Sequence, residues 1–95
     1  MSDHLLTPIQ VSGIADRLQL SASHQESDRA SSAFDRAAYD LHTLAVFPPE
    51  APLADMCLAT ANYYTQYLSR FNPSYTDVAR QIKRHLVALG FEVRS

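Results

Sequence analysis

The 95-residue chain has little of what several protein classes require. Cys57 is its only cysteine, so no intramolecular disulfide can form and a secreted disulfide scaffold is excluded. Two glycines leave little room for glycine-rich phosphate loops or for a β-sandwich of many turns. No apolar run approaches the roughly 18–20 residues that span a bilayer, and Met1–Leu6 lacks the basic and apolar regions of a signal peptide. We therefore expect a cytoplasmic protein without a membrane segment.

The patterns typical of enzymes and metal sites are also missing. The four histidines are scattered, and none pairs with another ligand at a spacing that zinc sites use. Cys57 lies in an apolar stretch without a neighbouring base, which favours an inert buried thiol over a nucleophile. There is no phosphate loop, dinucleotide fingerprint or G-x-S-x-G motif. The sequence thus predicts a protein that is not an enzyme, with no catalytic residue, metal or cofactor.

What the chain does have is helical periodicity, because apolar residues recur at spacings of three and four. We predict a short first helix over residues 8–20, capped by Thr7, and a long second helix over 23–47. Ser23 begins an S-x-x-E pattern, which predicts a capping box at the start of the second helix. Pro48 and its neighbouring prolines should stop that helix. Its predicted inner seam consists of Ala30, Phe34, Ala37, Leu41 and Leu44.

Two further helices follow, the third over residues 53–71 and the fourth from Ser74 to Leu89. The third is apolar on most sides, which indicates burial at the centre of the fold or in an oligomer interface. Gly90 is a typical helix-terminating residue, and Phe91 should fold back on the last turn. The predicted fold class is all-α, a small four-helix, bundle-like domain that covers residues 1–95.

Three tyrosines on the third helix, Tyr63, Tyr64 and Tyr67, are the most informative local feature. They cannot all enter one small core, because Tyr64 lies about 100° around the helix from Tyr63. Tyrosine is enriched at the centres of protein interfaces, where its ring is buried and its hydroxyl stays bonded. One set is therefore expected inside the fold, while the other is either half-buried or part of a partner interface.

Charge is segregated along the chain, because residues 1–55 carry a net charge of −5 and residues 56–95 a net charge of +3. The two halves could attract each other, or each could offer a charged face to a partner. Arg80, Lys83 and Arg84 lie on one face of the fourth helix, which invites comparison with a helix-turn-helix reader of DNA. The match is poor, since the preceding helix is long and apolar and the turn lacks glycine.

These observations predict a small non-enzymatic protein–protein interaction module, such as an adaptor, an inhibitor of the antitoxin or immunity kind, or a phage-type regulator. Its partner is expected to be another protein, and the surplus apolar surface of the third helix favours a homodimer. Tyr63, Tyr64 and Tyr67 are the predicted anchors. The predicted steering charges are Arg80, Lys83 and Arg84. The alternative is a small dimeric helix-turn-helix-like regulator that binds DNA through the basic fourth helix.

Overall fold

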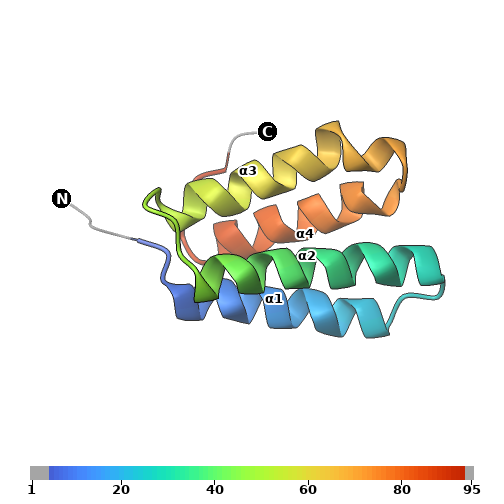
Figure 1. Cartoon of the computed structure of the whole chain (residues 1–95), viewed down its shortest axis with the longest axis horizontal. Coiled ribbons are helices and arrows are strands. Elements are labelled where there is room, and N and C mark those ends of the chain that lie inside the picture. The colour runs from blue at the N-terminus through green and yellow to red at the C-terminus, as the bar shows by residue number, and fades with distance from the viewer. Residues whose placement is uncertain (1–4, 94–95) are drawn as a thin grey trace.

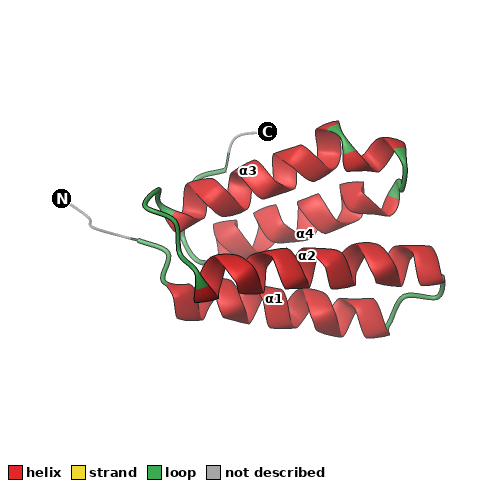
Figure 2. Ribbon diagram, in the orientation of Figure 1, coloured by secondary structure: helices red, strands yellow, loops and turns green. Residues whose placement is uncertain are grey.

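The structure, a computed structural model that describes residues 5–93, is a bundle of four helices packed side by side (Figure 1). No strand occurs in that part of the chain, so the predicted all-α fold is confirmed (Figure 2). Successive helices run in opposite directions. The helices are α1 (Pro8–Ser23), α2 (Asp28–Val46), α3 (Leu53–Gln66) and α4 (Ser74–Ala88), with a short 3-10 turn, η1 (Leu68–Arg70), between the last two.

The boundary between α1 and α2 differs from the prediction. The expected capping box of Ser23 is wrong, because Ser23 continues α1 and its hydroxyl donates to the carbonyl of Leu20 at 2.6 Å. The cap of α2 is Ser27, whose side chain accepts from the amide of Ala30 at 3.1 Å. At the other end of α1 the predicted capping box is present, with Thr7 and Gln10 bonded reciprocally at 3.0 and 3.2 Å. An S-x-x-E pattern alone therefore does not mark a helix start when the residues before it can continue a helix.

The end of α3 also comes earlier than predicted, at Gln66 and not at Phe71. The chain tightens into η1 and must then reverse before Pro73, whose ring disfavours helical geometry in the residue before it. The amide of Asn72 closes this turn by donating to the carbonyl of Leu68 at 2.9 Å. Because of the turn, Phe71 lies outside the helix that was predicted to include it and is 73% exposed.

The end of α4 is as predicted. Gly90 has a φ of 94°, the left-handed conformation that glycine adopts without strain. The amide of Gly90 donates to the carbonyl of Val87 at 2.9 Å, and that of Phe91 donates to the carbonyl of Leu86 at 3.0 Å. This pair of bonds is a Schellman motif, and it turns Phe91 back onto the core. Residues 94–95 of the tail lie outside the described part of the chain.

The core is one cluster to which all four helices contribute. On α2 the predicted seam is confirmed at Phe34, Ala37 and Leu41, and Ala33 and Ala38 widen it. α1 packs mainly against α2, and α3 against α4, while α2 joins the two pairs through α4. The start of α2 is tied to the turn before α4, because Arg29 donates to the carbonyl of Phe71 and the Asn72 amide group donates to the carbonyl of Arg29. No helix in residues 5–93 is long and apolar enough to cross a membrane.

Candidate functional site

The tyrosines of α3 separate into an inner and an outer set. Tyr64 is fully buried, and its hydroxyl donates to Oδ2 of Asp40 on α2 at 2.5 Å. Its ring packs against that of Tyr75 with centroids 5.1 Å apart. Burial, and then the bond to Asp40, raise the pKa of the Tyr64 phenol well above its ordinary value, so the hydroxyl stays protonated. Tyr64 therefore packs inside the fold, beneath the exposed side of α3, and is not itself available to a partner.

The outer set faces solvent beside a groove between α2 and α3. Tyr63 is 48% exposed and Tyr67 is 51% exposed, and their rings lie 5.4 Å apart. Across the groove stands Tyr39 of α2, which is 70% exposed. The groove has a volume of about 390 Å³, and Ala59, Thr60 and Thr43 also line it. We call this region, with Tyr39, Tyr63 and Tyr67 as its aromatic side chains, the tyrosine surface.

The position of Tyr39 and the hydrogen bond from Tyr64 to Asp40 were not assigned from the sequence. The position of Tyr39 opposite Tyr63 could not be predicted, since only packing sets the rotation of α2 against α3. Asp40 forms an ion pair with Arg36 at 3.4 Å, as the spacing of four residues indicates. The same carboxylate accepts the Tyr64 hydroxyl, so the acidic group nearest the groove already has two partners inside the protein.

The basic residues of α4 lie elsewhere. Arg80 and Arg84 line a different cavity, together with Gln25 and Phe34, while Lys83 is half-buried and lies outside it. Arg80 pairs with Asp77 on the same helix at 3.1 Å. α3 and α4 run antiparallel and side by side (Figure 1), whereas the two helices of a helix-turn-helix cross at about 90–120°. This geometry does not favour DNA reading by α4, and a steering role for the three basic residues stays a prediction.

Within residues 5–93 the segregated charges do not pair across the fold. The two arginine–carboxylate ion pairs there, and the contact of His42 with Asp16, each join residues of the same half of the chain. Arg29 does reach the other half, but it binds a backbone carbonyl there and not a carboxylate. The predicted attraction between the halves thus forms no ion pair within the described residues.

A serine, a histidine and an aspartate meet between α1 and α2. His42 is within 3.4 Å of the Ser12 hydroxyl through Nδ1 and within 3.2 Å of the Asp16 carboxylate through Nε2. The sequence signal was available, because Ser12 and Asp16 are four residues apart on one helix face. Hydrolysis of a carbonyl compound also requires donors for the oxyanion, and the backbone amides around Ser12 lie inside α1, where helix bonds occupy them. We read this trio as a polar tie between the two helices.

Two further findings concern the thiol of Cys57 and groups that could hold a metal ion. Burial raises the pKa of the Cys57 thiol to about 11, so it is protonated at neutral pH and a poor nucleophile. Within residues 5–93 no three histidine, cysteine, aspartate or glutamate side chains are placed to hold a metal ion.

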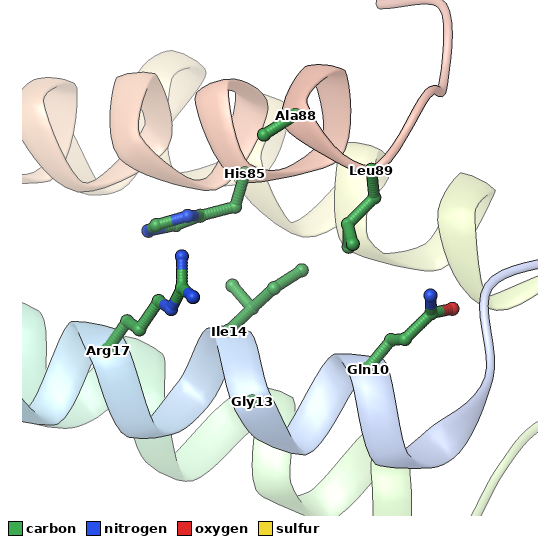
Figure 3. A pocket seen from close by; sticks show the side chains of 7 residues that line it. All are labelled: Gln10, Gly13, Ile14, Arg17, His85, Ala88 and Leu89. Carbon is green, nitrogen blue, oxygen red and sulfur yellow. The ribbon is translucent and has the colours of Figure 1, made fainter.

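A second groove lies between α1 and α4 and has a volume of about 370 Å³ (Figure 3). Its middle is apolar, formed by Ile14 and Leu89 with Gly13 on the α1 side. At one end Arg17 reaches from α1 toward the ring of His85 on α4, and Gln10 stands at the other end. The sequence gave no reason to bring Gly13 and His85 together, because residues 13 and 85 meet only through the packing of the first helix on the last.

No protein-family model, curated protein sequence or solved structure matches this chain.

Proposed function

We propose that the protein is a non-enzymatic protein–protein interaction module, that the tyrosine surface is its contact face, and that its partner there is a second copy of the chain. The observation that carries this proposal is the position of Tyr39 and Tyr63, exposed on facing helices on either side of one groove. Exposed tyrosines supply large contact areas at a low cost in side-chain entropy, and interface centres are enriched in them.

The chemistry of the surface supports self-association. In a two-fold symmetric contact the same patch meets itself, so an unpaired charge near the symmetry axis meets its own copy. The side chains of Tyr39, Thr43, Thr60 and Tyr63 are neutral, and Asp40 is already bonded to Arg36 and Tyr64. Two copies can therefore approach through this surface without charge repulsion at its centre.

The rigidity of the tyrosine surface also supports self-association. The ring of Tyr63 on α3 contacts that of Tyr67, the residue that caps α3, and also that of the buried Tyr64, so the exposed Tyr63 ring is held before binding. Side chains ordered in advance lose less entropy when a complex forms.

Sedimentation equilibrium of the full chain, from about 5 µM to about 500 µM, tests the proposal. We expect a reversible monomer–dimer equilibrium, and the double substitution Tyr39→Ser with Tyr63→Ser should weaken it at least about tenfold. The matched control is Leu20→Ser, which removes an exposed apolar side chain from α1, away from the tyrosine surface. A chain that stays monomeric throughout, or a dimer that the tyrosine substitutions leave unchanged, would overturn the proposal.

A further inference from the structure

We propose that the groove between α1 and α4 binds a small amphipathic carboxylate, a linear alkyl monocarboxylate of medium chain length, with its carboxylate at Arg17 and its chain along Gly13 and Leu89. This site is separate from the tyrosine surface, because the two grooves lie between different pairs of helices and share no lining residue.

The shape of the groove is the first argument. Its volume of about 370 Å³ lies at the lower end of the range for small-molecule sites, about 300–1,000 Å³. Gln10 and Arg17 mark its two ends and stand about 10 Å apart along the axis of α1. An extended alkyl chain advances about 1.2 Å per carbon, so a chain of about eight carbons matches this length.

The glycine is the second argument. Gly13 lies in the middle of α1, where glycine weakens a helix relative to alanine. Packing does not require it, since a Cβ built at Gly13 would meet nothing within 4 Å. Its φ is not positive either, because Gly90 is the glycine with that conformation. What Gly13 provides is an open stretch of helix surface along the groove.

The charge at one end is the third argument. Arg17 takes part in none of the ion pairs of residues 5–93, and its guanidinium reaches toward His85 across the mouth of the groove (Figure 3). A guanidinium offers two parallel N–H donors, which match the two oxygens of a carboxylate. A cation without a carboxylate partner at the end of an apolar groove fits a ligand with an anionic head and an apolar chain.

His85 makes the proposed binding of the carboxylate depend on pH. Burial lowers the pKa of His85, and Arg17 from α1 and Arg84 from its own helix lower it further. The ring is therefore neutral at neutral pH, and an anion placed beside it would favour the protonated form. Binding should take up a proton, so affinity should rise as the pH is lowered from about 8 to about 6.

Titration of the full chain with sodium octanoate, followed by calorimetry, tests the site. We expect saturable one-to-one binding, and the neutral analogue octanamide should bind about tenfold more weakly because Arg17 then lacks its anionic partner. Gly13→Leu should abolish binding by filling the groove, whereas Gln19→Leu, on an exposed position of the same helix, should not change it. Arg17→Gln should weaken octanoate about tenfold, while Arg70→Gln, which removes a charge at η1, should have no effect.

Circular dichroism checks that each variant folds. If Gly13→Leu does not fold, Gly13→Ala and Arg17→Gln decide the question, and Gly13→Ala should weaken octanoate measurably without any loss of helix. Non-saturable heat for the natural chain, or an affinity that neither substitution at Gly13 nor Arg17→Gln lowers, would overturn the proposal.

Discussion

The two grooves of the bundle have nearly equal volumes, about 390 Å³ between α2 and α3 and about 370 Å³ between α1 and α4, yet their chemistry is opposite. In the first, the one carboxylate is already bound by Tyr64 and Arg36, and the rim is formed by neutral tyrosines. In the second, the guanidinium of Arg17 lies at the end of an apolar groove and takes part in no ion pair of residues 5–93. The comparison teaches that the volume of a groove does not determine which ligand it suits. What distinguishes the two grooves is whether a charged side chain at the groove has a partner inside the protein.

The largest expected effect concerns the buried support of the tyrosine surface. Tyr64→Ala should cost about 4 kcal/mol of unfolding free energy, because it leaves a cavity and removes the hydroxyl that Asp40 accepts. On the α1–α4 side, Ile14→Ala should cost less, about 3 kcal/mol, since it removes a smaller buried side chain. Urea unfolding measures both. If Ile14→Ala cost as much unfolding free energy as Tyr64→Ala, or more, Tyr64 would not be the main support of its groove.

The next effect is an alkaline loss of stability that belongs to α3. Cys57 has its pKa raised from 9.0 to about 11 by burial, so the unfolded chain releases this proton at a lower pH than the folded chain. A raised pKa gives stability that is complete below pH 9 and declines as the pH rises toward 11, by about 3 kcal/mol in all. Urea midpoints across this range should fall in the natural chain, and Cys57→Ala should remove most of the decline below pH 10. A flat profile in the natural chain would contradict the burial of the thiol.

On the α1–α4 side the pH dependence has the opposite sign. The lowered pKa of His85 means that the folded chain binds fewer protons than the unfolded chain, so this residue costs stability as the pH falls below 6.5. His85→Gln should reduce the acid-side decline of the urea midpoint and leave the alkaline side unchanged. If the substitution altered the alkaline side, His85 and Cys57 would not titrate independently.

The smallest effects come from a matched pair of substitutions, one beside each groove. Gly13→Ala should stabilise the chain by about 0.5–1 kcal/mol, because the new methyl group meets nothing and alanine favours the helix. Ala59→Gly, at an exposed position of α3, should destabilise it by a similar amount, about 0.5–1 kcal/mol. Thermal unfolding compares the two. A loss of stability in Gly13→Ala would mean that the glycine is needed for packing, which would remove one argument for the ligand site.

Much of the fold could be predicted from the sequence, because helical periodicity and caps are local signals. The Thr7 capping box, the α2 seam around Leu41 and the Gly90 terminus were all predicted, whereas the false cap at Ser23 shows that a local motif can be overridden by the residues before it. The two candidate sites were harder to predict from the sequence. Tyr63, Tyr64 and Tyr67 were all predicted as anchors, but which of them is buried and where Tyr39 lies depend on how α2 packs against α3. The meeting of Arg17 with His85 depends on the packing of the first helix on the last, and no spacing along the chain encodes it.

The central claim is that the two grooves are separate sites with different partners, and amide NMR of one labelled sample tests it most directly. Dilution of the protein should shift the amide signals around Tyr39 and Tyr63, and octanoate should shift those around Gly13 and His85. The account predicts two sets of residues that do not overlap. Shifts from both treatments at the same amides, or dilution shifts centred on α1 and α4, would contradict it.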